Sequence, residues 1–283
     1  MMSATVRRIS EAARTLPPQL AAAARFVADH PLDAASIPMR ALARSANQSP
    51  ATFTRLARAL GMSGWDELKT ALLDEAREDL QAARDAPFSS RMTADMAGDN
   101  SIAVRMLASD RQAIAELPVD RIEAAAKVLE SAPRVLVAGF RSCHAPAMLF
   151  HYMYRLFRPD VSLIGGAGGV LDLELGGLQR GDAVLLFGFA PYSRDGLLTA
   201  RAAVEAGCPL VAVVDQPGAQ MAEGAAATLV FGADSPSYFP SLTSCAALVQ
   251  ALAATLYARA GADGREQLRL TEARIAQHTA YLP

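Results

Sequence analysis

Residues 49–61 read SPATFTRLARALG, and this stretch decides the fold of the first part of the 283-residue chain. Ser49 followed by Pro50 is typical of a helix start, because serine caps a first turn and proline there leaves no N–H unsatisfied. Apolar residues then recur at the spacing of one helix face: Phe53, Leu56, Ala57 and Leu60. Gly61 is typical of a helix end. The stretch therefore predicts one short amphipathic helix.

A second short helix is expected just before this one. Ser36 can cap it, and Pro38 fits its first turn. Its inner face is supplied by Leu42, Ala43 and Ala46. Residues 45–48 then form a tight turn in which Asn47 can take a left-handed backbone conformation. Two short helices joined in this way are the geometry that places the second helix in a major groove of DNA.

The outward face of the second helix carries residue types that bind DNA. The candidate contacts are Gln48, Ser49, Thr52, Thr54, Arg55 and Arg58. Hydroxyl groups and the amide can reach base edges, while the arginines can contact phosphate or guanine. Spacing alone leaves a second interpretation open, a solvated amphipathic helix in an ordinary bundle.

Charge is distributed unevenly along the chain. Residues 1–60 hold eight arginines against three acidic residues, a net charge of +5, whereas the whole chain carries −2. A basic first part on an acidic remainder is expected where a DNA-binding domain is joined to a domain of another kind.

From Pro133 onward the pattern changes to short apolar strands separated by helices. The expected strands are residues 134–139, 161–165, 183–189, 210–215 and 228–232. All are continuously apolar and rich in Val and Leu, as parallel strands buried on both faces are. The expected helices are residues 145–157, 170–175, 193–206 and 242–260. This alternation predicts an α/β domain with a doubly wound, flavodoxin-like sheet of five parallel strands. Together with the short helices before it, the predicted fold is an all-α bundle followed by this α/β domain.

Composition indicates a protein with an ordinary buried core, since 52% of the residues are hydrophobic and 20% are charged. Its three cysteines, Cys143, Cys208 and Cys245, are widely spaced and match neither a disulfide framework nor a zinc site. The most apolar run, residues 184–190, is too short to span a bilayer. We therefore expect a cytoplasmic protein with no membrane partner, metal or cofactor.

Residues 36–75 resemble the N-terminal domain of the RpiR-type transcriptional regulators. That family has a Leu-Ala pair, then Ser-x-Ala-Thr-x-x-Arg, then a Leu-Gly and a Gly-aromatic pair. This chain supplies Leu42-Ala43, Ser49, Ala51-Thr52, Arg55, Leu60-Gly61 and Gly64-Trp65. It departs from the family at Asn47 and Gln48, where glycine and an aliphatic residue are usual. The resemblance implies a regulator that binds a double-stranded DNA operator as a homodimer or homotetramer.

Residues 133–260 resemble the second half of that family, a sugar-isomerase-type (SIS) domain. In such a domain the loops after parallel strands present backbone N–H groups and hydroxyls to a ligand. The resemblance implies a small-molecule effector, a phosphorylated sugar or a derivative of one. Its predicted ligands are Gly139, Arg141, Ser142, Cys143, Tyr192, Ser193, Arg194, Ser237 and Ser241.

Several loop positions depart from the family's pattern by losing a hydroxyl group. Cys143, Gly188 and Gly196 stand where the family has serine, serine and threonine, and residues 217–222 contain no hydroxyl. A phosphate needs several donors to offset its desolvation. Three interpretations therefore stay open for this domain: a phosphosugar site, a site for a less charged metabolite, and a role in dimerisation only.

Catalysis is not expected, although a sugar-phosphate isomerase with an appended bundle is the alternative reading. An isomerase needs a positioned base, and the candidates are His144 and Glu174. Cys143 at a helix start can have a lowered pKa and so be redox-reactive; the competing interpretation is a small loop residue.

The predicted organisation has four parts. Residues 1–84 form the helix-turn-helix domain, and residues 85–117 form a linker and an inter-domain helix. Residues 118–262 form the SIS domain, and residues 263–283 form a helical tail.

Overall fold

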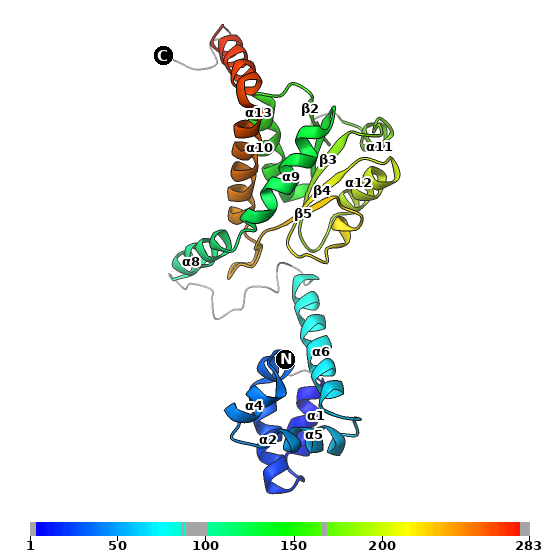
Figure 1. Ribbon diagram of the computed structural model, residues 1–283, viewed down its shortest axis with the longest axis vertical. Coiled ribbons are helices and arrows are strands. Elements are labelled where there is room, and N and C mark those ends of the chain that lie inside the picture. Colours follow the sequence, from blue (N-terminus) through cyan, green and yellow to red (C-terminus); the bar gives the residue numbers. More distant parts are fainter. Residues whose placement is uncertain (1–3, 86–87, 89–100, 166–168, 278–283) are drawn as a thin grey trace. The chain divides into compact units, whose positions relative to one another are not determined.

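The computed structural model describes residues 4–85, 88, 101–165 and 169–277. The chain divides into two compact units, residues 1–86 and residues 87–283, coloured blue to cyan and green to red in Figure 1. Residues 86–87 and 89–100 of the predicted linker segment lie outside the described residues.

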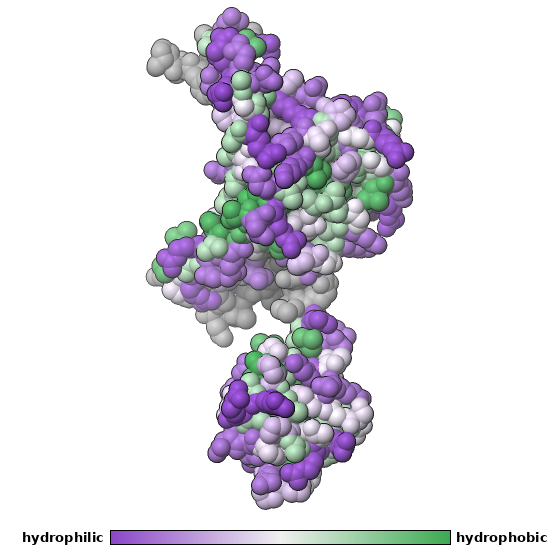
Figure 2. All heavy atoms as spheres, in the orientation of Figure 1, coloured by the Kyte–Doolittle hydropathy of each residue, from purple (hydrophilic) through white to green (hydrophobic). Residues whose placement is uncertain are grey.

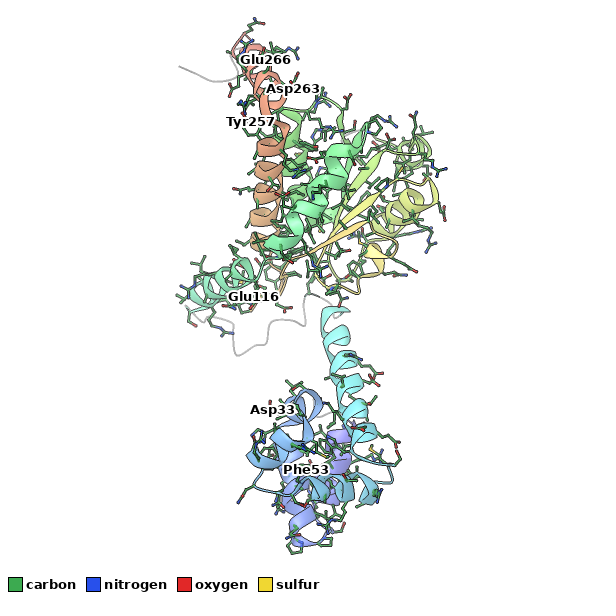
Figure 3. The ribbon with its side chains drawn as sticks, viewed as in Figure 1. Asp33, Phe53, Glu116, Tyr257, Asp263 and Glu266 are labelled. Carbon is green, nitrogen blue, oxygen red and sulfur yellow. The ribbon has the colours of Figure 1, made fainter. Side chains whose placement is uncertain are left out.

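The first unit is a bundle of short helices followed by one longer helix. These are α1 (Ala4–Ala12), α2 (Pro18–Asp29), α3 (Pro31–Ser36), α4 (Met39–Ser45), α5 (Pro50–Ala59) and α6 (Trp65–Asp85). Phe53 of α5 is fully buried at the centre of the bundle, where its ring meets Trp65 edge-on at 5.2 Å (Figure 3). The predicted apolar face of α5 therefore forms the core of this unit, as its spacing indicates.

The turn between α4 and α5 confirms the predicted backbone conformation. Asn47 has a φ of +49°, in the left-handed region, and Gly61 after α5 has a φ of +81°. The predicted start of α4 is wrong. Ser36 ends α3, where its hydroxyl donates to the Leu32 carbonyl at 2.7 Å, and Pro38 occupies the N-cap position of α4.

The second unit is built on the predicted five-stranded parallel sheet, and its strands lie in the order β2-β1-β3-β4-β5. The strands are β1 (Val135–Gly139), β2 (Val161–Ile164), β3 (Ala183–Gly188), β4 (Leu210–Val214) and β5 (Ala227–Val230). Every residue of β1, β3 and β4 is buried. Their continuous apolar composition reflects a sheet covered on both faces.

Helices cover both faces of this sheet (Figure 1). They are α8 (Ile102–Ala115), α9 (Val119–Ser131), α10 (His144–Arg155), α11 (Leu171–Gly176), α12 (Arg194–Glu205) and α13 (Thr243–Gln277). Helices α9, α10 and α13 share a core cluster with Val137 and Leu185, whereas α11 and α12 pack against Leu136 and Leu186 on the other face. Successive side chains of β1 and β3 point to opposite faces of the sheet, so the unit has one apolar core on each face.

Helix α8 belongs to the second unit through its contacts with α13 and the loop before it. Asp110 of α8 is buried and accepts a hydrogen bond from the Thr243 hydroxyl at 2.9 Å. Val104 and Leu107 of α8 are nevertheless about 70% exposed. Figure 2 shows apolar patches that interrupt the hydrophilic surface of this unit.

Helix α13 is long and apolar enough to cross a membrane by length and composition. Its first half is instead a core helix, because Leu248, Leu252 and Leu256 are buried against the sheet. Gly261, with φ +58° and ψ −132°, kinks the helix where the sequence predicts a break between a closing helix and a tail. The end of that predicted tail, residues 278–283, lies outside the described residues.

Candidate nucleic-acid interface and ligand cleft

Helix α5 presents two arginines to solvent. Arg55 and Arg58 are exposed, and Arg58 Nε lies 3.5 Å from the Ser63 carbonyl. Arg55 has no hydrogen-bond partner among the described residues. Ser49 is also exposed, and Gln48 is half-buried beside it. These four side chains lie on α5 or just before its first turn and are at least partly open to solvent.

The other two predicted DNA contacts lie differently. Thr52 is 2% exposed, and its Oγ1 lies 2.9 Å from Ser49 Oγ, so the prediction that it reaches base edges is wrong. Thr54 is half-buried, with its hydroxyl 3.9 Å from the sulfur of Met39 on α4. Arg40 and Arg44 on α4 are also exposed. Both contribute to the positive charge of residues 1–60, but neither is among the DNA contacts predicted from the sequence.

A cleft of about 310 Å³ opens at the carboxyl ends of β1 and β3. Its lining comprises Phe88, Phe140, Arg141, Ser142, Cys143, Phe187, Gly188, Phe189, Pro191, Ser193 and Phe239. Ligands of open parallel sheets bind at this edge, where the strand order reverses between β1 and β3. Four of the predicted ligand residues therefore lie together: Arg141, Ser142, Cys143 and Ser193.

The remaining predicted ligand residues do not line this cleft. They are Gly139, Tyr192, Arg194, Ser237 and Ser241. The Tyr192 hydroxyl donates to the Asp215 carboxylate at 2.6 Å and so braces the loop after β3. Ser241 is buried and accepts from the Thr243 N–H at 3.2 Å, which orders the start of α13. The Ser237 N–H donates to the Ser235 hydroxyl at 3.0 Å.

The loop after β1 is tightly wound. A Cβ on Gly139 would lie 2.2 Å from the Cys143 carbonyl oxygen and 2.8 Å from the Ala147 methyl group. Arg141 has a φ of +54°, a left-handed conformation that a long side chain rarely adopts. This backbone, together with the buried Cys143, fixes the wall of the cleft from which Arg141 and Ser142 project.

Two of the positions that lack a hydroxyl are filled by one neighbouring side chain. A Cβ on Gly188 would lie 2.5 Å from the sulfur of Met221, and one on Gly196 would lie 2.7 Å from its methyl group. Met221 is 1% exposed. The thioether therefore occupies the space that side chains at residues 188 and 196 would need.

Burial raises the pKa of Cys143 to about 12, and the negative charge of Asp215 adds to the effect. The interpretation of Cys143 as a redox-reactive thiol with a lowered pKa is therefore wrong, whereas the competing interpretation as a small loop residue agrees with its burial. Cys208 and Cys245 also have raised pKa values, for which burial is again the main cause.

We expect Cys143 to react with iodoacetamide at pH 7.5 at least ~100-fold more slowly than free cysteine, because the thiol stays protonated below pH 12. The rate should rise as the pH approaches 12, within the range where the chain stays folded. Mass spectrometry of the Cys143 peptide measures the rate, with the same peptide from denatured chain as the control. Equal rates in the folded and denatured chain would contradict the assignment.

The candidate catalytic bases lie outside the cleft lining. Glu174 accepts a hydrogen bond from the Gly165 N–H at 2.8 Å and so holds the loop after β2. His144 is half-buried as the first residue of α10. The cleft itself contains no Glu, Asp or His among its described lining residues. An isomerase needs a base at its substrate, and neither candidate base is among the residues that line this cleft.

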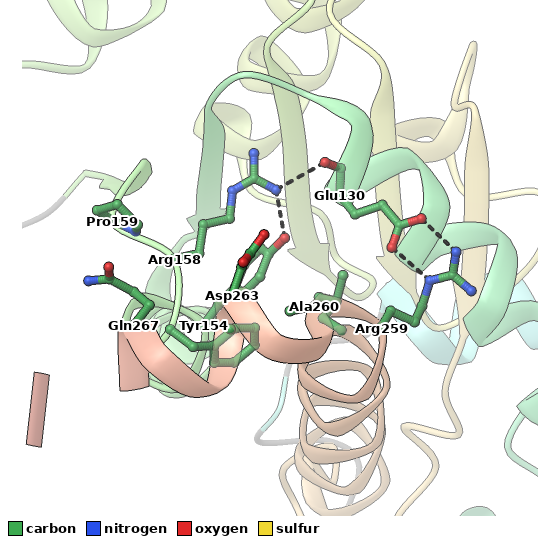
Figure 4. A pocket seen from close by; sticks show the side chains of 11 residues that line it. Glu130, Tyr154, Arg158, Pro159, Arg259, Ala260, Asp263 and Gln267 are labelled. Carbon is green, nitrogen blue, oxygen red and sulfur yellow. Dashed lines mark hydrogen bonds and ion pairs between the residues drawn. The ribbon is translucent and has the colours of Figure 1, made fainter. Parts of the chain in front are cut away.

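A second cavity, of about 780 Å³, lies beside the kink of α13 (Figure 4). It adjoins the ends of α9 and α10 that lead into the amino ends of β1 and β2. Its arginines are already paired: Arg259 binds both Glu130 oxygens at 2.6 and 2.7 Å, and Arg158 binds Tyr154 Oη at 2.8 Å. Because both arginines are engaged by neighbouring side chains, this cavity is a weaker candidate ligand site than the cleft at the carboxyl ends of the strands.

Comparison with known proteins identifies both units. Residues 4–79 match the helix-turn-helix domain of the rpiR family. The second unit shares the fold of a solved sugar isomerase domain, a five-stranded parallel sheet flanked by helices. This match and the two solved regulators described next confirm the resemblance of the sequence to RpiR-type regulators.

Two solved structures carry the comparison of folds. The sugar isomerase domain of the RpiR transcription factor from Sphaerobacter thermophilus has 22% identity and a TM-score of 0.57, over 61% of this chain and 99% of that one. The Vibrio vulnificus NanR protein, solved with ManNAc-6P, has 14% identity and a TM-score of 0.54, over 96% of this chain and 98% of that one. No curated protein sequence matches the chain significantly.

Proposed function

We propose that this chain is a cytoplasmic, sequence-specific DNA-binding transcriptional regulator whose SIS domain binds a small metabolite and thereby changes operator affinity. The observation that carries the proposal is the pair of exposed arginines on α5, the second helix of an rpiR-type helix-turn-helix. A recognition helix reads base edges and phosphates with such residues. Gln48, Ser49 and Thr54 complete the proposed contact surface.

The regulator acts as a homodimer or homotetramer. A helix-turn-helix protein reads two half-sites with two copies of its recognition helix. Apolar side chains on the second unit support a contact between copies, since Val104, Leu107 and Val119 are each about 70% exposed. Exposed apolar side chains that gather on one surface mark such interaction sites.

The effector binds in the cleft at the carboxyl ends of β1 and β3. A phosphorylated sugar or derivative is supported by the NanR protein, which was solved with ManNAc-6P. A less charged metabolite is supported by the apolar lining of the cleft. Either ligand modulates DNA binding only by its difference in affinity for the two states of the regulator.

Phe88 offers a route from the cleft to the DNA-binding unit. Its ring lines the cleft and packs against the Phe239 ring, with centroids 4.8 Å apart and the two planes tilted by 56°. In the sequence it is the third residue after Asp85, with which α6 ends. A ligand that packs against or displaces Phe88 therefore acts on the segment that leads directly to the DNA-binding unit.

Replacing Phe88 by alanine should uncouple effector and operator. We expect DNA affinity without effector to stay within about threefold of the parent. The ratio of DNA affinities with and without effector should fall at least ~5-fold, which is the smallest usual allosteric coupling. Fluorescence anisotropy of a labelled operator measures both quantities. Tyr238→Ala is the matched control, because Tyr238 is 58% exposed and does not line the cleft. An unchanged effector response in Phe88→Ala would remove Phe88 from the route.

Footprinting of the full chain tests the proposed function. Duplexes are selected from a random pool and probed with hydroxyl radicals in complex with the chain. The proposal predicts two protected half-sites centred about one helical turn, 10–10.5 base pairs, or a multiple of it apart. Uniform protection of every duplex would contradict sequence-specific recognition.

A further inference from the structure

The wall of the ligand cleft is dominated by aromatic rings. Five phenylalanines line it: Phe88, Phe140, Phe187, Phe189 and Phe239. Phe239 is central, with its ring 4.8 Å from Phe88 and edge-on to Phe189 at 6.1 Å. These rings come from four separate segments of the second unit, so the apolar wall is a product of the fold. Such a wall favours an apolar ligand body, which gains stabilisation as its surface leaves water.

Polar groups in the lining are few, and one is already engaged. The Ser193 hydroxyl accepts a hydrogen bond from the Gly196 N–H at 3.1 Å as the N-cap of α12. Arg141 and Ser142 are the other polar side chains among the described lining residues, apart from the protonated Cys143 thiol. Arg141 is exposed, which places its positive charge at the mouth of the cleft rather than in its interior.

The part of the cleft near Cys143 is unfavourable for a multiply charged anion. Asp215 lies at the carboxyl end of β4, where its carboxylate accepts from the Tyr192 hydroxyl. Its negative charge acts on Cys143, which lines the cleft. A phosphate dianion placed there would be repelled by Asp215, and it needs several donors to offset its desolvation.

Met221 removes the space in which further donors would stand. Its sulfur and methyl group occupy the positions of side chains at Gly188 and Gly196, on the two segments that flank Ser193. The flexible, polarisable thioether extends apolar packing and donates no hydrogen bond. At residues 188 and 196 the sulfur and methyl group of Met221 thus stand where donor side chains would need space.

We propose that the cleft binds a small organic acid with an aromatic or similarly apolar body and a single carboxylate, rather than a sugar phosphate. The body lies among the phenylalanines, and the carboxylate meets the Arg141 guanidinium and the Ser142 hydroxyl at the mouth. A volume of about 310 Å³ is at the small end of ligand sites, which fits one ring system with a short acidic side chain. The inference rests on the proposed function only in taking this cleft as the effector site.

Thermal denaturation of the full chain tests the ligand class without DNA. The probes are phenylacetate and indole-3-acetate at millimolar concentration, with glucose 6-phosphate and N-acetylmannosamine 6-phosphate as the contrasting pair. We expect at least one of the two acids to raise the Tm of the second unit by about 4 °C at tenfold its Kd. The sugar phosphates should leave the Tm unchanged.

Variants assign the binding to the cleft. Arg141→Gln should raise the Kd of the acid about tenfold, the effect of losing one charge-assisted hydrogen bond. Phe239→Ala should abolish the Tm shift, whereas Tyr238→Ala, beside it but outside the lining, should keep it. Should Phe239→Ala fail to fold, saturation-transfer NMR on the parent replaces it, and the ring protons of the acid should receive most of the transferred saturation.

Two results would overturn the proposal. One is a Tm rise with either sugar phosphate and none with the acids. The other is the absence of any shift from both acids, whatever the sugar phosphates do. Neither result bears on DNA binding, which is measured without ligand, so failure of the regulator proposal and failure of the ligand class are told apart.

Discussion

Replacing both Arg55 and Arg58 by alanine is expected to weaken binding of the full chain to a selected operator at least ~100-fold. Each arginine contact to a base or phosphate contributes roughly 1–3 kcal/mol, and the two lie on one surface of α5. Both side chains are exposed, so their loss removes no core packing. The slope of log affinity against log salt concentration should also become shallower by about two if both contact phosphates.

The matched control removes the same charge from elsewhere in the first unit. Arg14→Ala with Arg25→Ala alters two exposed arginines that lie outside α4 and α5. We expect this variant to lose less than about fivefold in affinity, because distant charges act only through the screened field. Equal losses in the two double variants would show that net charge, rather than the surface of α5, holds the DNA.

Replacing Gly139 by alanine is expected to destabilise the second unit by about 3 kcal/mol or more. The added methyl group would meet the Cys143 carbonyl oxygen at 2.2 Å and the Ala147 methyl group at 2.8 Å. Neither neighbour is the end of a flexible side chain, so the loop after β1 must shift as a whole. Urea denaturation followed by circular dichroism measures the loss.

Gly218→Ala is the control for this change, because nothing lies within 4 Å of the position that its Cβ would take. It should alter the free energy of unfolding by less than about 0.5 kcal/mol, as exposed substitutions do. A folded Gly139→Ala chain with parent stability would contradict the tight approach between β1 and the start of α10.

The sheet was predictable because its signal is local and strong. Strands buried on both faces must be continuously apolar, and each of the five predicted runs overlaps an observed strand. Helix starts were less predictable. In the structure Ser36 closes α3 with a hydroxyl bond back to its own helix, and Pro38 stands at the N-cap of α4 rather than in its first turn.

Thr52 shows how a site residue can be misassigned within a correctly predicted helix. It precedes Leu56 by four residues, so it lies on the apolar stripe and not on the outward face. The spacing already contained this information. Arg55 and Arg58 lie off that stripe, and the structure leaves them exposed as predicted.

The ligand cleft was only half visible in the sequence. Arg141, Ser142, Cys143 and Ser193 follow strand ends, where ligands of parallel sheets are expected, and they line the cleft. Phe88 and Phe239 were missed because they are far apart in sequence and meet only through folding of the segments before α8 and α13. The role of Met221 was equally hidden, since it depends on the space above Gly188 and Gly196.

The most direct test of the regulator proposal is the ratio of two affinities at one salt concentration. The full chain is titrated against its selected duplex and against a shuffled duplex of the same length and composition. Sequence-specific recognition predicts that the selected duplex binds at least ~1,000-fold more tightly, the lower end for specific DNA-binding proteins. Equal affinity for the two duplexes would contradict the account.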